Sequence, residues 1–251
     1  MIRGKEREIY RNSGGKDPAD LFNLTQNLKE STMRQEHGKN AAPAEKHAAS
    51  PQETKIVLAD PTALGVFGLS MVTFVASFQK LGMTEGVTYL IPWALMLGCC
   101  AQLIGSIIDF FRNNIFGAVV LGAFGLFWVA VSTHWMISIG WFGPSAEGAA
   151  DVSQIGYAFL GYFIFSVFVT VAALEVSKVF GIMLVLIDIL LLGLALSSLG
   201  VAPHETKMIA GLAELGTALI GFYATGGLFL NGFFKRTILP MGKPFGFIRK
   251  G

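Results

Sequence analysis

The chain has 251 residues, of which 53% are hydrophobic and 14% charged, and its formal net charge is +2. A soluble domain is usually about 25% charged, and a nucleic-acid-binding domain usually carries a concentrated basic patch, so the composition argues against both classes. Cys99 and Cys100 are adjacent inside an apolar run, which excludes a disulfide framework.

Residues 1–57 differ in composition from the rest of the chain. They contain ten Lys or Arg and eight Asp or Glu, half of all the charged residues. We expect a mostly disordered tail, with one short amphipathic helix near Phe22 and Leu28. No apolar signal-peptide core follows Met1.

From residue 58 to 242 the sequence predicts a transmembrane domain, followed by a short basic tail at 243–251. A helix needs about 20 mostly apolar residues to cross a bilayer core. Six stretches meet this requirement, at about 64–81, 87–108, 116–137, 155–174, 179–199 and 208–233. A β-barrel would need alternating polarity, and continuous runs such as 181–196 do not alternate. The expected fold is therefore all-α, with six transmembrane helices.

The basic residues predict the orientation of these helices. With both termini in the cytoplasm, the outer loops carry only Lys80 and Lys207. The inner segments then carry Lys55, Arg112, Lys178, Lys235, Arg236, Lys243, Arg249 and Lys250. The positive-inside rule thus favours a multi-pass protein of a plasma or bacterial inner membrane with both termini inside.

Glycines recur inside the predicted helices, above all at five-residue steps in the sixth, at Gly211, Gly216, Gly221 and Gly226. Small residues let helices approach closely in lipid. A five-residue step places them on two faces of the helix. One hypothesis is packing within one bundle; the sharper hypothesis, which we favour, is that one face packs inside the protomer and the other against a neighbouring subunit.

Two carboxylates interrupt the apolar stretches. Asp188 is central in the fifth, where a charge is expensive, and desolvation is expected to favour its neutral form. It is either a proton carrier or a structural carboxyl bonded to a neighbour. Glu214 lies about two turns into the sixth helix and is expected in a vestibule or at an interface that reaches water.

Other polar groups are candidates for a substrate path. Thr73, Gln102 and Asn114 could hydrogen-bond a substrate, although most polar residues in helices bond to backbone. Asp109 and Glu175 lie at inner helix ends, solvated or paired with Arg112 and Lys178 respectively. No cluster of His, Cys and carboxylate has the spacing of a metal site, and no P-loop, dinucleotide fingerprint or nucleophile elbow stands out. We expect no metal, no cofactor and no enzymatic activity.

Several short motifs occur in a characteristic order. The first predicted helix opens with Asp60-Pro61-Thr62-Ala63-Leu64-Gly65-Val66, and the domain ends with Lys235-Arg236-Thr237-Ile238-Leu239-Pro240-Met241-Gly242. Between them stand Ala101-Gln102, Asp109, Asn114-Ile115-Phe116-Gly117 and Phe127-Trp128. This series resembles the acetate uptake transporter family, which includes bacterial succinate–acetate permeases and fungal acetate and ammonia exporters. The resemblance covers about residues 59–242.

The resemblance implies six helices around a pore in each protomer, homo-hexamers in the membrane, and acetate, related carboxylates such as succinate, and protons as partners. It also implies a hydrophobic pore constriction at Leu69, Phe124 and Ile187. All three differ from the usual Phe, Tyr and Leu, so a phenolic hydroxyl is absent at Phe124. Asp60 replaces the signature Asn and adds negative charge at the inner mouth.

An apolar neck excludes hydrated ions by dewetting but admits a small acid that can lose its charge. The sequence therefore favours transport of small monocarboxylates, channel-like or proton-coupled. The alternatives are an ammonia or ammonium pathway, another six-span small-anion channel, and a non-transporting membrane sensor or scaffold that uses residues 1–57 as its effector.

Overall fold

The computed structural model describes residues 22–23, 26–31, 33–34 and 58–248. The chain divides into two compact units, Met1–Ile56 and Val57–Gly251, and each is considered by itself. In the first unit the described residues are helical, and the disorder expected of the tail concerns residues outside the described ones. The rest of the fold concerns the second unit.

The second unit contains six helices long and apolar enough to cross a membrane, which confirms the predicted number. The spans are α3 (Thr62–Lys80), α4–η1–α5 (Leu90–Phe111), α6 (Ile115–Ser138), α8 (Val152–Leu174), α9 (Lys178–Ser198) and α10 (Pro203–Phe234). A short helix, α7 (Pro144–Gly148), lies in the longest connection. Lipid offers the backbone no hydrogen-bond partners, so such apolar stretches satisfy themselves as helices.

The second span is not a uniform helix. It consists of α4 (Leu90–Trp93), a π-helical segment η1 (Ala94–Ala101) and α5 (Gln102–Phe111). A π-helix has more residues per turn than an α-helix, so it changes the direction in which later side chains point. Gln102, the first residue after η1, is consequently placed by the π-helical segment.

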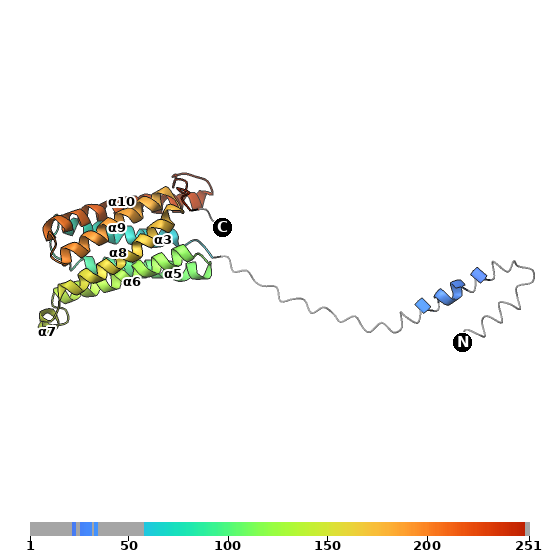
Figure 1. The fold of residues 1–251 in the computed structure, drawn as a ribbon, viewed down its shortest axis with the longest axis horizontal. Coiled ribbons are helices and arrows are strands. Elements are labelled where there is room, and N and C mark those ends of the chain that lie inside the picture. The colour runs from blue at the N-terminus through green and yellow to red at the C-terminus, as the bar shows by residue number, and fades with distance from the viewer. Residues whose placement is uncertain (1–21, 24–25, 32, 35–57, 249–251) are drawn as a thin grey trace, which may run out of the picture. The chain divides into compact units, whose positions relative to one another are not determined.

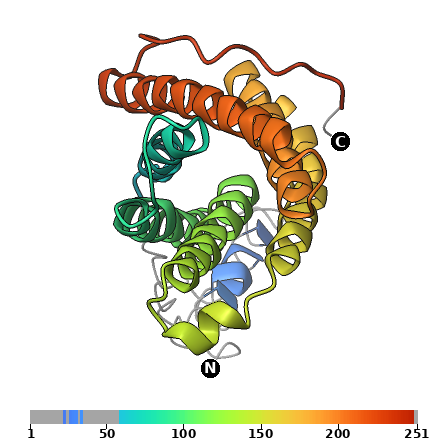
Figure 2. The ribbon, with the colours of Figure 1, turned by 90° about the vertical axis from the view of Figure 1, so that its left-hand side faces the viewer.

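The six spans form a closed ring in sequence order, because α3 packs against both the second span and α10, and α8 packs against both α6 and α9. Figure 1 shows the helices side by side along their length, and Figure 2 shows their arrangement in cross-section. Between α6 and α8 the ring closes through aromatic contacts and through Tyr162 Oη, which donates to the Ala123 carbonyl over 3.1 Å.

The two glycine-lined faces of α10 both pack against other helices of the same chain. Gly211 packs against Lys80 and Leu81, next to α3, whereas Gly216 packs against Leu186 of α9. The expectation that one face meets a neighbouring subunit stays a prediction, because these contacts all lie within one chain. The ring itself needs both faces thin, because α10 packs against α3 on one side and α9 on the other.

The segment after α10 turns back over the end of the bundle. Asn231 holds its beginning by accepting from the Ile238 and Leu239 amides and donating to the Leu239 carbonyl. Glu175 Oε1 accepts from the Phe247 amide over 2.6 Å and the Ile248 amide over 3.1 Å. The sequence suggested that Glu175 is solvated or paired with Lys178; its Oε1 instead accepts from backbone amides of this returning segment.

Candidate functional site

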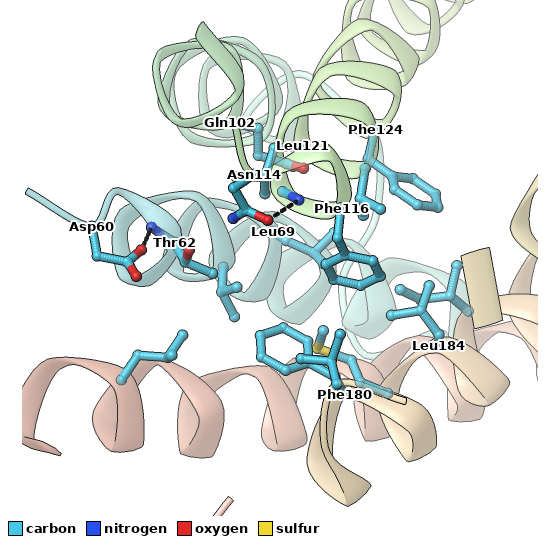
Figure 3. A pocket seen from close by; sticks show the side chains of 17 residues that line it. Asp60, Thr62, Leu69, Gln102, Asn114, Phe116, Leu121, Phe124, Phe180 and Leu184 are labelled. Atoms are coloured by element: carbon cyan, nitrogen blue, oxygen red, sulfur yellow. Dashed lines mark hydrogen bonds between the residues drawn. The ribbon is translucent and has the colours of Figure 1, made fainter. Parts of the chain in front are cut away.

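A cavity of about 250 Å³ opens at the end of the ring where α3 begins. We call it the Asp60-side cavity. Side chains of α3, α5, α6 and α9 form most of its wall, which is apolar apart from a few polar groups (Figure 3). Three residues of the predicted substrate path, Asp60, Gln102 and Asn114, line it together with the three expected constriction residues.

Gln102 is the most unusual polar group in this cavity. Its side chain is fully buried, and neither its amide nitrogen nor its amide oxygen has a hydrogen-bond partner among the described residues. Leaving a buried polar group unpaired costs about 1–3 kcal/mol. A primary amide that offers a donor and an acceptor in the wall of a cavity can bind both a carboxylate oxygen and a carboxylic-acid hydroxyl.

Asn114 is the N-terminal cap of α6. Its Oδ1 accepts from the Gly117 amide over 3.4 Å and caps the first turn of α6 (Figure 3). Gly117 is required at that place because a Cβ would collide with the Asp109 carboxylate. The amide of Asn114 thus belongs to the cavity wall, but its oxygen is already used by the helix end.

The three expected constriction residues converge at the deep end of the Asp60-side cavity. Leu69, Phe124 and Ile187 come from α3, α6 and α9 and are 7%, 3% and 2% exposed. No polar atom belongs to any of these side chains. We call this set the neck.

A second cavity, of about 300 Å³, opens at the opposite end of the ring and includes Lys80. We call it the Lys80-side cavity. It begins one helical turn beyond the neck, because Phe127 and Leu190 line it while Phe124 and Ile187 line the other cavity. Three residues of α-helix rise about 4.5 Å. The separation between the two cavities on α6 and α9 is therefore one turn of apolar side chains.

Glu214 lies in the wall of the Lys80-side cavity, but its side chain is buried, whereas the sequence suggested a vestibule or interface residue that reaches water. Its carboxylate is 1% exposed and forms an ion pair with Lys80, with 2.9 Å between Oε2 and Nζ. His134 and Lys207 line the same cavity. Sequence reasoning missed the partnership of Lys80 with Glu214 because the two residues are more than 130 positions apart.

Charged groups cluster at the mouth of the Asp60-side cavity. Arg112 donates to Asp109 Oδ1 over 2.7 Å and to Asp60 Oδ2 over 3.1 Å, and Asp60 Oδ1 accepts from the Thr62 amide over 2.9 Å. Partial burial raises the pKa of Asp60, but the hydrogen bonds from Thr62 and Arg112 outweigh it, so the pKa lies below its ordinary value. Burial lowers the pKa of Arg112, and the two carboxylates more than compensate, so its net pKa is raised.

This arrangement changes the interpretation of the start of α3. A helix N-terminus with free amides attracts anions, but here the Asp60 carboxylate already occupies the Thr62 amide. The pairing of Asp109 with Arg112 that the sequence suggested is present.

Two residues of the predicted substrate path line neither cavity. Thr73 donates to the carbonyls of Leu69 and Ser70 in its own helix, so it is a backbone-bonded threonine. Asp188 Oδ2 accepts from Thr170 Oγ1 over 2.7 Å, which joins α9 to α8. Of its two hypotheses, the geometry favours the structural carboxyl.

A closed ring of six apolar helices, entered from opposite ends by two cavities with one apolar turn between them, defines a multi-pass membrane protein built around a pathway. The model of the GPR1/FUN34/yaaH family matches residues 42–242, and the chain belongs to this family.

The chain is similar to the succinate-acetate/proton symporter SatP of Escherichia coli (strain K12), with 25% identity over 190 residues that cover 74% of this chain and 96% of that protein. It is also similar to ammonia transport outward protein 2 of Saccharomyces cerevisiae, with 27% identity over 172 residues, 66% of this chain and 59% of that one. A solved structure, of the bacterial acetate channel SatP, shares the fold with a TM-score of 0.68 and 22% identity, covering 74% of this chain and all of that chain.

Proposed function

We propose that this protein carries acetate and related small monocarboxylates, with protons, across a membrane through the neck formed by Leu69, Phe124 and Ile187. The observation that carries the proposal is the thinness of the barrier, because one turn of apolar side chains separates the two cavities on α6 and α9. Such a barrier repels hydrated ions by dewetting and is short enough for a two-carbon acid to cross.

Gln102 supports the choice of substrate. Its unpaired amide lies in the wall of the same cavity as the neck, so a carboxyl group that loses water there gains a hydrogen-bond partner. The acetate and succinate named for the bacterial relative fit this chemistry.

Asp60, Arg112 and Asn114 form the mouth of the pathway on the cytoplasmic side. This orientation follows from the basic residues, since Arg112, Lys178 and Lys235 lie at the end of the ring where α3 begins. The assembly we propose is a homo-hexamer, whose subunits cover part of the outward apolar surface. That surface carries large exposed side chains such as Phe168 and Leu219.

The test is uptake of labelled acetate, lactate, succinate and formate into proteoliposomes, with and without a pH gradient, against protein-free liposomes. Phe124→Trp should block the neck and abolish the protein-dependent acetate flux. Phe229→Trp, on the exposed surface, is the matched control and should leave it unchanged. Flux no greater than in protein-free liposomes would refute the proposal.

Ammonia is the second candidate, because a neutral molecule of that size also crosses an apolar neck and a fungal relative is named for its export. The same vesicles distinguish the two substrates when they contain a pH-sensitive dye. Rapid alkalinisation of the interior by ammonium salts, without acetate uptake, would establish the ammonia pathway instead.

A further inference from the structure

The Lys80-side cavity contains a buried ion pair, Lys80–Glu214, that takes no part in forming the neck. Lys80 is the last residue of α3, and Glu214 begins the fourth turn of α10. Their side chains are 10% and 1% exposed, and 2.9 Å separates Nζ from Oε2. The two side chains therefore form a close, buried, charge-assisted contact.

An ion pair in this position is a poor structural device. Two charges lose their hydration when they are buried, and well-packed apolar residues often stabilise a protein as much or more. Small residues elsewhere, such as Gly211 against Lys80 and Leu81, already hold α10 against α3. The pair also faces a cavity of about 300 Å³, enough for several waters at about 30 Å³ each.

The wall of this cavity offers a second donor besides the ammonium group. Trp128 lines the same cavity and is 3% exposed, and its indole N–H has no acceptor among the described residues. A carboxylate has two oxygens, each of which accepts hydrogen bonds. An ammonium and an unpaired N–H in one cavity wall therefore suit an organic carboxylate. In the structure the ammonium is paired with a carboxylate of the protein itself, that of Glu214.

We propose that Lys80 is the carboxylate-binding group of the Lys80-side cavity and that Glu214 is its exchangeable internal counter-ion. The inference rests on the proposed transport of carboxylates and assigns its proton coupling to one pair of residues. When Glu214 takes up a proton, Lys80 is released to bind the carboxylate of the substrate. The cavity then gains one proton and one anion together, and its net charge does not change.

The next step delivers a neutral molecule to the neck. Glu214 passes its proton to the bound carboxylate, so RCOO⁻ and H⁺ become RCOOH, and the Lys80–Glu214 ion pair forms again. No electron is transferred and no other bond changes. The neutral acid no longer binds the ammonium strongly, and it lies one helical turn from Phe124, where its charge would have been excluded.

The other groups that face Glu214 are compatible with this role. Among the described residues that line the cavity, the remaining charged or titratable groups are Lys207 from α10 and His134 from α6. The lining from α9 consists of Leu and Ser, and that from α8 is Phe159. Lys207 is exposed and attracts anions to the mouth, whereas His134 has an imidazole that also binds protons and therefore needs its own control.

Glu214→Gln tests the proposal, because glutamine keeps the shape of the carboxyl but cannot exchange a proton. In wild-type proteoliposomes, protein-dependent acetate uptake should fall about tenfold per pH unit above the titration range of a one-proton step. In Glu214→Gln this dependence should flatten. Glu205→Gln, on an exposed turn of the same helix, and His134→Gln should both keep the wild-type profile.

Lys80→Met should raise the acetate concentration that half-saturates uptake roughly tenfold to a hundredfold, which corresponds to the loss of one charge-assisted contact. The double variant Lys80→Met/Glu214→Gln leaves no unpaired charge, so it is expected to fold even where a single variant does not, and it should show the same weak binding. Infrared difference spectra provide a readout without transport. Acetate added to the wild type should produce a protonated-carboxyl band that ¹³C-labelled acetate does not shift and Glu214→Asp does.

The outcomes separate the inference from the function on which it rests. Wild-type vesicles that take up no acetate would refute the transport function itself. Wild-type uptake combined with an unchanged pH profile in Glu214→Gln, or with unchanged half-saturation in the double variant, would overturn the role of the ion pair alone. A pH profile that flattens only in His134→Gln would assign proton uptake to the imidazole and also overturn it.

Discussion

Phe124 and Phe127 of α6 lie edge to face, with their ring centroids 6.4 Å apart, and the two rings line different cavities. One helical turn of a single span thus carries both sides of the barrier. Because the barrier is so thin, single substitutions in this turn are expected to change which acids cross more than they change the fold.

Phe124→Leu should widen the neck. We expect uptake of lactate relative to acetate to rise several-fold, because the aromatic ring no longer limits the width of the passage. A single large-to-small substitution of this kind costs about 0.5–3 kcal/mol, so the protein should still fold. Competition uptake in proteoliposomes measures the ratio, and Phe229→Leu on the exposed surface should leave it unchanged. An unaltered ratio in Phe124→Leu would place the selectivity elsewhere.

Gln102→Leu should separate function from stability. Leucine removes two unpaired buried polar atoms, so we expect unchanged or higher thermal stability, by as much as about 1–3 kcal/mol. Acetate uptake should fall at least tenfold, since the dehydrated carboxyl loses its partner. Unfolding temperature and acetate flux, measured on the same preparation, test the expected gain in stability and the expected loss of transport. A variant that transports at the wild-type rate would remove Gln102 from the pathway.

Asp60→Asn should change the pH dependence of stability. The pKa of Asp60 is lower in the folded protein than in the unfolded chain, so its contribution is present above the ordinary aspartate range and is lost as pH falls through the depressed value. Asparagine can still cap the Thr62 amide but cannot pair with Arg112. Wild type should therefore be the more stable protein at neutral pH, and the difference should vanish in acid.

Thermal unfolding of the purified protein across pH measures that difference. The effect should be modest, because the Asp60 side chain is 59% exposed and solvent screens its charge. Asp151→Asn, at the start of α8, is the matched control, since Asp151 also caps a helix but lies at the opposite end of the ring. A stability difference at position 60 that persists unchanged in acid would contradict the assigned pairing.

Asp188→Asn should leave the pH profile of transport unchanged. Asp188 accepts from Thr170 between α8 and α9 and lines neither cavity, and asparagine can still accept that hydrogen bond. Asp188→Leu should lower the unfolding temperature, because the Thr170 hydroxyl loses its partner. Proteoliposome uptake across pH, compared with Glu214→Gln, provides the measurement. A flattened profile in Asp188→Asn would restore its interpretation as a proton carrier.

Glu175→Ala should release the end of the returning segment. The Phe247 and Ile248 amides lose their acceptor, so their hydrogen exchange should accelerate by roughly tenfold, corresponding to about 1.4 kcal/mol of lost protection. Exchange in α9 should not change. Equal protection of the two amides in wild type and variant would show that the segment is held by other contacts.

The sequence by itself determined the six spans, because uncharged apolar stretches of this length have only one low-energy backbone structure in lipid. Their observed bounds differ from the expected ones by a few residues, most at α10, which begins at Pro203 rather than near residue 208. The resemblance to the transporter family also implied that Leu69, Phe124 and Ile187 form one set, and these three residues line one cavity.

Only the tertiary structure decided which polar groups face the pathway. A carboxylate in an apolar helix needs a partner, but the hydropathy pattern does not predict which residue supplies it. Asp188 accepts a hydrogen bond from Thr170 on the neighbouring helix, whereas Glu214 forms an ion pair with Lys80 in a cavity wall. The π-helical segment before Gln102 and the return of the chain onto Glu175 were equally invisible in the sequence. Each depends on contacts between residues distant along the chain, and local pattern carries no record of them.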